Sequence, residues 1–389
     1  MDVNELVAAD EAAELLGVQR RTIYAYVSRG QLARHVLPGS RQSWFDPREL
    51  EQLKRGDRAQ HQPRRTAASE LTHVTSIVDD RLLYQDRDAI AMARQNTFEG
   101  TAEWLWRRHE GPVPPWRPSR ALQAHAEVVP LPELCLPVDR LKITTASLGA
   151  VDALRYDLSP AAVLAVGRSL LASLVGALPP LTDTPPAGDG IAEALWPRLT
   201  AAPVGDHERR LLDAALIVSA DHGLAPSTRA ARIAAATAAD PYSVVLTGMS
   251  VASGLEHGGS SLRVHSLLND IAHRDRVHVV LSEHLRTGAA LPGFGQPRYT
   301  GKDPRAAFLL ELALGRAPDA QRSDVVRSVA DLVRRRNGEH PNIEFALGAL
   351  CFLYDMVSGA GEAIFVLARS AGWLAHAIEE YAEKSAARR

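Results

Sequence analysis

Residues 219–269 read SADHGLAPSTRAARIAAATAADPYSVVLTGMSVASGLEHGGSSLRVHSLLN. This stretch is rich in alanine, glycine and serine and contains few charged residues. Because small side chains at helical spacing allow helices to pack closely, it predicts the packed centre of a helical protein. It also contains two histidines in unusual settings, His222 after an aspartate and His257 before two glycines. Glycine allows a backbone to approach a ligand or another helix, so this segment is where we expect an active site.

The composition favours helices over sheets. Of 389 residues, 46% are hydrophobic and only 5% are aromatic, and alanine and leucine recur throughout. The length suggests two or three domains with a large core. A formal net charge of −2 gives no global field that would steer the whole chain to nucleic acid or to a membrane. The composition therefore predicts a mainly α-helical fold.

Cysteine usage and hydropathy indicate the compartment. Cys135 and Cys351 are the only cysteines and lie far apart, which fits a reducing cytosol. The N-terminus lacks the basic-then-apolar pattern of a signal peptide. The longest apolar run, residues 346–368, is interrupted by Asp355 and Glu362, so a buried helical hairpin explains it better than a membrane span. We expect a cytoplasmic protein with no membrane partner.

Residues 6–55 form a unit of their own. EAAELLGV predicts a helix that Gly17 ends, and QRRTIYAYVSRG predicts a second helix that ends at Gly30. Two helices joined by a tight turn with glycine are typical of a helix-turn-helix. The apolar runs around residues 38–40 predict a hairpin or wing. Residues 46–49 (DPRE) then cap and open a third helix.

The charge of this unit is one-sided. The stretch between positions 17 and 45 contains no acid and five arginines: Arg20, Arg21, Arg29, Arg34 and Arg41. Contact with DNA phosphates requires such a basic surface, and the N-terminus of the second helix favours phosphate as well. The residues that we expect to contact DNA are Arg20, Arg21, Thr22, Tyr24 and Arg41.

The residues LGVQRRTIYAYVSRGQL resemble the MerR/excisionase type of winged helix-turn-helix. The resemblance implies a DNA-binding domain at residues 1–55 that contacts DNA through residues 6–55. A small helical domain that contacts another protein is the alternative, and the sequence leaves both open. Residues 56–70 contain no large apolar side chain and predict a flexible linker.

Five separated motifs follow in residues 71–389. They are VTSIVDDRLLYQDRDAIAMARQNTFEGTAEWLW, SADHGLAPSTRAARIAAATAADPYSVVLTGMSVASGLEHGGS, GFGQPRYTGKDPRA, HPNIEFALG and ARSAGWLAHAIEEY. Their order resembles that of citrate synthases, in the actinobacterial type with an N-terminal helix-turn-helix. The resemblance implies an almost entirely helical homodimer in which two domains close over the site. It places the large domain at 71–257 and 351–389 and the small domain at 258–350.

The reaction of that family joins acetyl-CoA to oxaloacetate. A base removes a methyl proton, the enol attacks the ketone, and the citryl thioester is hydrolysed. This chemistry requires a carboxylate near the methyl group and hydrogen-bond donors at the thioester and ketone oxygens. A dicarboxylate acceptor also requires arginines, because their planar guanidinium binds carboxylates in a bidentate manner.

The resemblance assigns residues to these roles. His257 in LEHGG matches the histidine that stabilises the enol, and His222 in SADH matches an oxaloacetate-binding histidine. Arg305 in DPR and Arg369 in ARSAGW match arginines that bind the acceptor's carboxylates. An arginine in an apolar helix is costly unless paired, which supports Arg369 independently. Arg388 matches an arginine that reaches the partner's site. The alternative for His257 is a core histidine whose hydrogen bonds are satisfied, and the alternative for His222 is a helix-cap role. For Arg388 the alternative is a frayed chain terminus.

Two positions depart from the family pattern. Gln296 stands where the family's GFGH motif has a histidine that donates to the ketone oxygen, and glutamine cannot supply a proton to the forming alkoxide. Glu344 stands where PNVD has the aspartate base, which moves the carboxylate outward by roughly 1 Å. Together these changes predict weak citrate synthesis, a different acceptor or no catalysis.

Coenzyme A, by the same resemblance, enters as a substrate at the small domain, and we expect no cofactor. The GFG at 293–295 allows close backbone approach, and the arginines at 334–336 are candidates for the nucleotide phosphates. A solvated helix face is the alternative for that arginine run. The histidines between 265 and 284 lack metal-site spacing on one helix face, so we predict no metal site.

Two functional hypotheses follow. The first is an acyltransferase of the citrate synthase type, with His257, Glu344 and Gln296 at the reacting atoms and acetyl-CoA or a related acyl-CoA and oxaloacetate or a similar 2-oxo acid as substrates. The second is a DNA-binding regulator in which a catalytically impaired site senses a dicarboxylate or an acyl-CoA. A dimer that closes on its ligand would reposition paired helix-turn-helix units, so the two are compatible.

Overall fold

The computed structural model divides the chain into two compact units, Met1–Thr66 and Ala67–Arg389. It describes residues 6–28, 32, 35–36, 43–54, 71–118, 122–125, 132, 135–183, 188–288 and 290–386. The division between the units falls inside the stretch that composition predicts to be a linker, residues 56–70.

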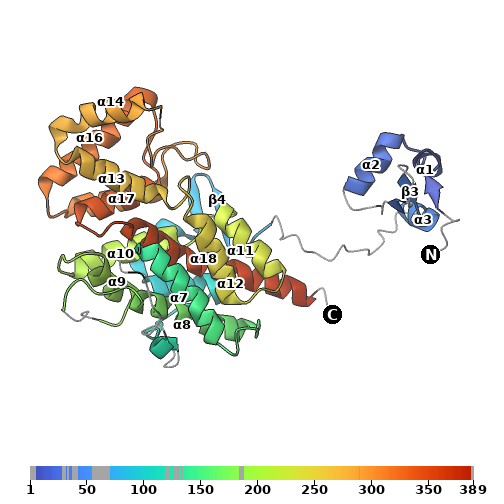
Figure 1. The fold of residues 1–389 in the computed structure, drawn as a ribbon, viewed down its shortest axis with the longest axis horizontal. Helices are drawn as coiled ribbons and strands as arrows, with labels where there is room; N and C mark the ends of the chain where they lie inside the picture. Colours follow the sequence, from blue (N-terminus) through green and yellow to red (C-terminus); the bar gives the residue numbers. More distant parts are fainter. Residues whose placement is uncertain are drawn as a thin grey trace. The chain divides into compact units, whose positions relative to one another are not determined.

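The first unit contains short helices and a small sheet (Figure 1). Its elements are β1 (Val7–Ala8), α1 (Ala9–Leu16), α2 (Arg20–Ser28), β2 (His35–Val36), β3 (Ser43–Phe45) and α3 (Pro47–Lys54). The sheet is antiparallel with the order β1-β3-β2. Gly17 ends α1 with φ 66°, and the Asp46 carboxylate accepts the Arg48 N–H at the start of α3. These three helices confirm the local predictions, whereas Gly30 and the expected wing at 38–40 lie outside the described residues.

The first unit has its own small core. The buried apolar residues are Ala9, Ala12, Ala13, Ile23, Leu32, Phe45 and Leu50. They come from all three helices, β3 and the single described residue between α2 and β2. This unit therefore packs around its own apolar residues, and its identity as a helix-turn-helix stays a prediction.

The second unit is mainly helical. Its strands are β4 (Thr75–Val78), β5 (Arg81–Tyr84) and β6 (Arg87–Asp88). Its helices are α4 (Ala89–Gln95), α5 (Phe98–Arg107), α7 (Pro137–Val151), α8 (Pro160–Gly176), α9 (Ile191–Leu199), α10 (Asp206–Ser219), α11 (Pro226–Ala236), α12 (Pro241–Ala252), α13 (Ser260–Ile271), η2 (Arg274–Arg276), α14 (Val277–Arg286), α15 (Pro304–Gly315), α16 (Ala320–Asn337), α17 (Ile343–Leu353) and α18 (Ala360–Ala386). The prediction of a mainly α-helical fold is confirmed for this unit.

Local signals in the sequence explain many of these boundaries. Asp79 and Asp80 both have positive φ, 50° and 58°, which is the backbone of a tight β-hairpin turn between β4 and β5. The side chains of Asp88, Thr97 and Ser159 accept backbone N–H groups at the N-termini of α4, α5 and α8. These local signals therefore account for the β4–β5 hairpin turn and for where these three helices begin.

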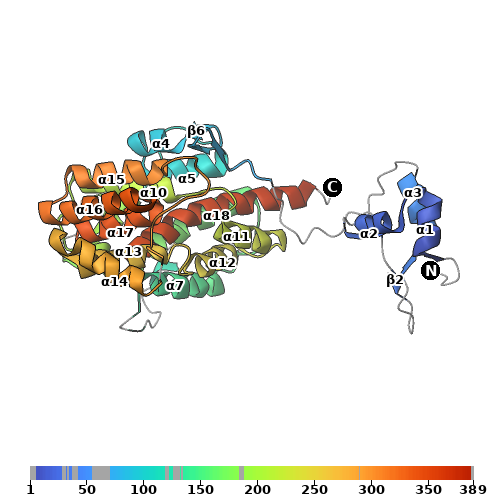
Figure 2. The same cartoon turned by 90° about the horizontal axis from the view of Figure 1, so that it is seen from above.

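The long helix α18 forms the centre of the second unit (Figures 1 and 2). It contacts α5, α7, α8, α10, α11, α12, α13 and α17. The residues from Ala360 to Ala377 are all buried along it. Together α17 and α18 confirm the buried helical hairpin predicted for residues 346–368. No helix among the described residues is long and apolar enough to cross a membrane.

The predicted division of this unit into a large and a small domain meets one structural constraint. The boundary expected between residues 350 and 351 falls inside α17, so a hinge there would interrupt a continuous helix. The boundary expected at 257–258 falls in the turn before α13. The division into 71–257 plus 351–389 and 258–350 stays a prediction.

The alanine- and glycine-rich stretch forms α11, α12 and α13, and α11 and α12 pack on α18. At Gly248 in α12, an added Cβ would lie within 2.7 Å of Cε3 of Trp373, which is fully buried in α18. That distance is too short for a side chain, so only glycine allows α12 to approach the indole this closely. The prediction of a closely packed helical centre is confirmed here.

We expect Gly248→Ala to lower the free energy of unfolding by about 1–3 kcal/mol, since the methyl group would force α12 away from Trp373. Urea unfolding of the purified chain measures this. Gly176→Ala is the matched control, because a Cβ at this exposed helix end meets no atom within 4 Å. Equal urea midpoints for the two variants would contradict the packing argument.

Candidate functional site

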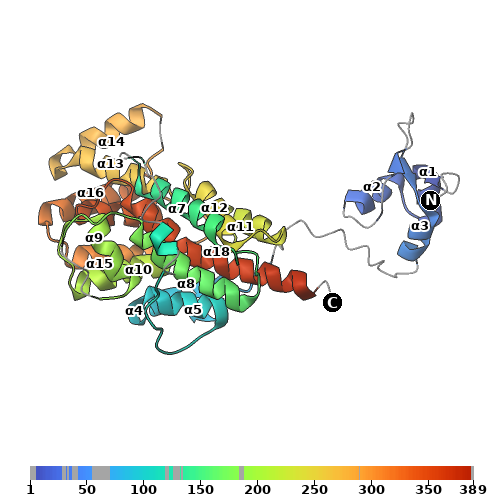
Figure 3. The same ribbon diagram turned by 60° about the horizontal axis from the view of Figure 1, so that its bottom comes forward.

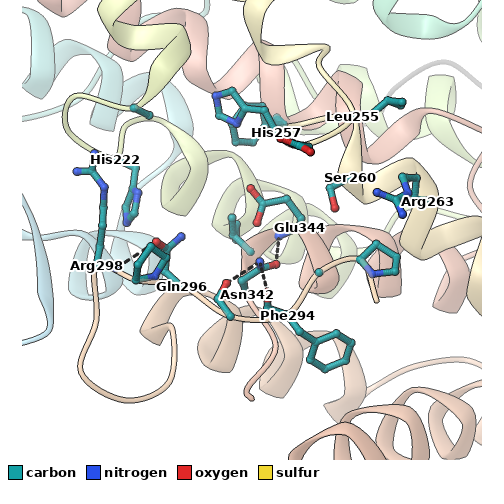
Figure 4. Close-up of a pocket in the computed structure, with 18 of the residues that line it drawn as sticks. His222, Leu255, His257, Ser260, Arg263, Phe294, Gln296, Arg298, Asn342 and Glu344 are labelled. Carbon is teal, nitrogen blue, oxygen red and sulfur yellow. Dashed lines mark hydrogen bonds between the residues drawn. The ribbon is translucent and has the colours of Figure 1, made fainter. Parts of the chain in front are cut away.

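A cavity of about 510 Å³ lies in the second unit (Figure 4). Segments that are far apart in the chain line it, including the turns before α11 and α13, the loop before α15 and the start of α17. The expected site residues that line it are His222, His257, Gln296, Arg305, Glu344 and Arg369. Arg388, the seventh residue expected at the substrates, lies outside the described residues. The fold thus brings six of the seven positions to one cavity.

Comparison with known protein families supports the resemblance from which these site residues were predicted. The family model "Citrate synthase, C-terminal domain" matches residues 64–389, which is most of the chain. The chain belongs to the citrate synthase family.

Known relatives agree with this assignment. The chain is 28% identical to a citrate synthase of Synechocystis sp. over 64% of the chain and 66% of the relative. It is 32% identical to a citrate synthase of Haloferax volcanii over 43% of the chain and 46% of the relative, so these two matches span less than two thirds of the relatives. Its match to citrate synthase 2 of Bacillus subtilis is 26% identical and covers 79% of the chain and 88% of the relative.

Solved structures share the fold. A citrate synthase from Thermotoga maritima superposes with a TM-score of 0.62 at 23% identity, covering 79% of this chain and 88% of the other. A citrate synthase from Thermoplasma acidophilum, solved with carboxymethyl coenzyme A and oxaloacetate, superposes with a TM-score of 0.67 at 19% identity, covering 81% and 90%. At these identities the comparisons establish the fold.

His257 lies in the tight turn between α12 and α13. A Cβ at the following Gly258 would come within 2.8 Å of the Ala252 carbonyl oxygen, so the turn requires glycine there. The His257 Nε2 is 2.9 Å from the Ser227 hydroxyl, and the ring meets Phe365 edge to face at 5.4 Å. Burial, with a contribution from the charge of Arg369, lowers the pKa of His257 to about 4. The ring is therefore neutral at pH 7 and carries one N–H to donate.

His222 lies just beyond the C-terminal end of α10 and is buried. Its Nε2 is 2.9 Å from the Tyr299 hydroxyl, so the ring bonds to a side chain of the loop before α15. Burial, followed by the charges of Arg305 and Arg369, lowers the pKa of His222 well below its ordinary value. Both candidate histidines are thus uncharged in a cavity that contains several cations.

The two buried arginines differ in how they are satisfied. Arg305 donates from Nε and Nη2 to the two oxygens of Asp303, at 3.0 and 2.7 Å. Arg369 donates from Nε to the Ser219 carbonyl at 2.8 Å, and its guanidinium lies 4.6 Å from the centre of the Phe365 ring. The Nη1 of Arg369 is buried and has no partner among the described residues. An unsatisfied buried cation at a cavity is a strong site for an anion.

Glu344 begins the first turn of α17, where Asn342 is the N-cap. The Asn342 side chain accepts the Glu344 N–H at 3.1 Å and donates to the Gly295 carbonyl at 2.9 Å. This residue therefore fastens the loop before α15 to the helix that carries Glu344. Burial raises the pKa of Glu344, and the charge of Arg305 opposes that rise. A higher pKa makes the carboxylate a stronger base.

Gln296 follows a glycine turn in which Gly293 and Gly295 both have positive φ, 85° and 74°. Its Oε1 accepts the Arg298 backbone N–H at 3.3 Å, which leaves the amide NH₂ available as a donor. Figure 4 shows His257, Glu344 and Gln296 around the same opening. At the position where the resemblance implies a histidine, the chain therefore has a neutral donor.

The structure adds residues that the sequence did not single out. Arg298 lines the cavity, and its Nη1 would lie 3.1 Å from a Cβ at Gly223, so the guanidinium reaches the turn that holds His222. Ser227 and Tyr299 bond to the two candidate histidines. Arg298 and Tyr299 lie within the motif GFGQPRYTGKDPRA, but nothing in that string separates them from its other polar residues.

A buried network holds the turn that contains His222. The Asp221 carboxylate accepts from Thr75, from the Gly223 N–H at 3.1 Å and from His376, whose Nε2 is 3.2 Å away. Although burial opposes ionisation, the charge of His376 holds the pKa of Asp221 below its ordinary value. His376 is in turn 3.0 Å from the buried Arg232. This buried network therefore holds the backbone turn that carries His222.

The residues expected to contact DNA lie on the first unit. Arg20, the first residue of α2, is exposed and forms an ion pair with Asp10 at 3.2 Å. Tyr24 is 37% exposed on the same helix, and Thr22 is half-buried. Nothing is described of the Arg21 side chain or of Arg41. An exposed ion pair is weak, so Arg20 remains available to a phosphate.

A cluster of His, Cys, Asp or Glu side chains able to hold a metal ion does not occur within the described ranges.

We predict that His257 stays neutral down to about pH 4, because burial and Arg369 both oppose its protonation. NMR of histidine-labelled full chain, titrated from pH 8 to pH 3.5, measures this. In denaturant the same ring should titrate near its ordinary value of about 6.5. Removing the neighbouring charge with Arg369→Gln should raise the folded-state pKa, whereas a wild-type midpoint near 6.5 would contradict the assignment.

Proposed function

We propose that the chain condenses an acyl-CoA, with acetyl-CoA as the expected one, with oxaloacetate or a similar 2-oxo acid. The observation that carries the proposal is the unpartnered Nη1 of the buried Arg369, whose side chain is among those that line the cavity together with His257 and Glu344. A buried guanidinium with an unmade hydrogen bond favours a carboxylate ligand, and the neighbouring groups supply a base and a hydrogen-bond donor.

The acceptor would bind first through its carboxylates. Arg369 offers an unpaired N–H, whereas Asp303 already neutralises most of the charge of Arg305. Arg298 forms no ion pair with any described residue and reaches toward His222. We therefore assign the acceptor's carboxylates to Arg369 and Arg298, with Arg305 supplying its remaining N–H. His222, held by Tyr299, would contact the same ligand.

Carbon–carbon bond formation would then begin with proton removal. Glu344 takes a proton from the methyl group of the acyl-CoA, and its raised pKa favours this step. His257 stabilises the enol through a hydrogen bond. If Ser227 donates to the His257 Nε2, the proton of the neutral ring resides on Nδ1, which becomes the donor to the thioester oxygen.

The enol carbon then attacks the ketone carbon of the acceptor. Gln296 donates a hydrogen bond to the oxygen that becomes an alkoxide, but an amide cannot give up a proton, so water must protonate this oxygen. Hydrolysis of the resulting thioester releases free CoA and the hydroxy acid. We expect two features to limit the rate of condensation. They are glutamine at position 296 in place of histidine, and the side chain of Glu344, which is one methylene longer than that of aspartate.

Exposed apolar side chains support a homodimer. Ile233 on α11 is 53% exposed and Val251 on α12 is 37% exposed, and these two helices pack against each other. Exposed apolar side chains on neighbouring helices are typical of an interface between subunits. We propose that two chains pair through this face, in the cytoplasm, and that Arg388 reaches the partner's site. We assign the CoA phosphates to the exposed arginines in the last turn of α16.

Release of CoA from acetyl-CoA and oxaloacetate by the purified chain tests the activity. We expect slow turnover by the wild type and an increase of about a hundredfold in Gln296→His with Glu344→Asp, because the pair restores a proton donor and the base position. Arg369→Gln is expected to abolish turnover, since the acceptor loses its buried cation.

Controls separate loss of chemistry from loss of structure. Each variant is compared with wild type for its thermal unfolding midpoint, and Arg298→Ala should raise the acceptor's KM more than it lowers kcat. Folded wild-type and double-variant proteins that both release no CoA would rule out the proposed reaction with these substrates.

A second function rests on the first unit. This unit suits a DNA-binding domain in three respects. Two of its helices are joined by a three-residue turn, it has a small antiparallel sheet, and Arg20 and Tyr24 are exposed on its second helix. With Gln296 and Glu344 weakening catalysis, the cavity would serve as a sensor of a dicarboxylate or an acyl-CoA. The alternative function is therefore a ligand-responsive DNA-binding regulator.

A mobility shift with DNA from upstream of the chain's own gene tests this alternative. We expect binding that oxaloacetate alters and that weakens with salt, since phosphate contacts release counterions. Arg20→Ala should weaken binding on any sequence, whereas Glu11→Ala, which removes an exposed acid of α1, should not. No shift with or without oxaloacetate would exclude the regulator.

A further inference from the structure

A second pocket, of about 800 Å³, lies where α4, α10 and α15 meet. Figures 2 and 3 show these three helices in the second unit. The pocket is lined by the end of α4, the first half of α10 and the second half of α15. No described residue lines both this pocket and the candidate active site, so the two are separate.

Arginines from three different elements converge on this pocket. Arg94 comes from α4, Arg210 from α10 and Arg316 from the residue after α15. None of these three guanidinium groups forms an ion pair with a described residue. Arg94 lies 5.2 Å from the centre of the Phe308 ring, which gives the pocket a flat cationic wall. Convergence of unpaired cations on a hollow differs from the usual solvated arginine on a convex helix face.

The acids of the pocket do not neutralise these arginines. Asp206 and Asp213 both lie nearest to a fourth arginine, Arg209, at 4.0 and 3.7 Å. The Asp213 carboxylate also accepts the Phe98 N–H, and burial raises its pKa to about 7, so its charge is only partly present at neutral pH. Glu311 is the remaining acid in the lining. Arg209 also pairs with Glu193 at 3.6 Å, so Arg209 engages three of the nearby acids, and Glu311 is the one acid of the described lining left for the three other arginines.

One further polar group completes the lining. His207 is half-buried, its Nε2 is 3.1 Å from the Tyr354 hydroxyl, and burial lowers its pKa. At neutral pH the ring is therefore a hydrogen-bond partner and adds no charge. The pocket thus combines unpaired guanidinium groups with a neutral imidazole and an aromatic surface.

We infer that this pocket binds a phosphorylated small molecule. Guanidinium groups bind phosphate oxygens in a bidentate manner. A phosphate group carries nearly two negative charges and three acceptor oxygens, so it can accept from several guanidinium groups at once, whereas a single carboxylate has one charge and two oxygens. The volume lies within the range of small-molecule pockets and far exceeds a phosphate ion, so the ligand carries an organic part next to Arg94 and Phe308. The inference concerns binding alone and holds whether or not the chain condenses acyl-CoA with a 2-oxo acid.

Calorimetric titration of the full chain with glucose 6-phosphate and, separately, with inorganic pyrophosphate tests the inference. We expect saturable binding of at least one probe at one site per chain, and tighter binding of the sugar phosphate if the organic part contributes. In the triple variant Arg94→Gln, Arg210→Gln, Arg316→Gln, affinity should fall by about tenfold for each arginine removed.

Three controls make the result specific. A second triple variant removes the same charge from exposed side chains elsewhere and should leave the affinity for the probes unchanged; it carries Arg274→Gln, Arg276→Gln and Arg286→Gln. Arg298→Gln removes an exposed cation from the lining of the candidate active site and should also leave the affinity for the probes unchanged. Arg210→Glu, a single exposed change, should reproduce the loss if the triple variant unfolds. Absent wild-type binding, binding retained in the pocket variants, or equal loss in any control would overturn the inference.

Discussion

The second unit is built around one buried cation. Arg369 lies in the middle of α18, the helix on which most other helices pack, and its guanidinium is fully buried. Moving such a charge out of water costs on the order of several kcal/mol unless neighbouring groups compensate. The Ser219 carbonyl, the face of Phe365 and the field of Asp221 compensate in part, and one N–H remains unsatisfied. That remaining N–H defines where an anionic ligand is favoured.

The same cation sets the electrostatics of the cavity. Burial lowers the pKa of both histidines, assisted by the charge of Arg369 at His257 and by those of Arg305 and Arg369 at His222. Both rings are therefore neutral and act as hydrogen-bond partners and not as acids. Glu344 experiences the opposite balance, because burial raises its pKa more than the arginines lower it. A neutral donor beside a strengthened base is what proton removal from a weak carbon acid requires. Gln296, which stands where the resemblance leads us to expect a histidine, is a neutral donor beside this arrangement.

Much of the fold was predictable because its signals are local. Capping residues such as Asp88 and Thr97, and the paired aspartates at 79–80, act within a few residues of where they stand. The candidate site was predictable in part, because the order of five motifs assigns positions by resemblance. Arg298, Ser227 and the network of Asp221 and His376 were not predictable, since each acts through a contact between segments distant in sequence.

The sequence by itself determined the helical character of the second unit and the starts of many helices, and its resemblance to the family drew attention to positions 296 and 344. Only the tertiary structure decided which charges are paired. Arg305 and Arg369 look alike in the sequence, yet one is bound by Asp303 and the other keeps an open N–H. Arg94, Arg210 and Arg316 resemble any surface arginines until α4, α10 and α15 bring them to one pocket. Pairing depends on distance and burial, and the packing of helices fixes both.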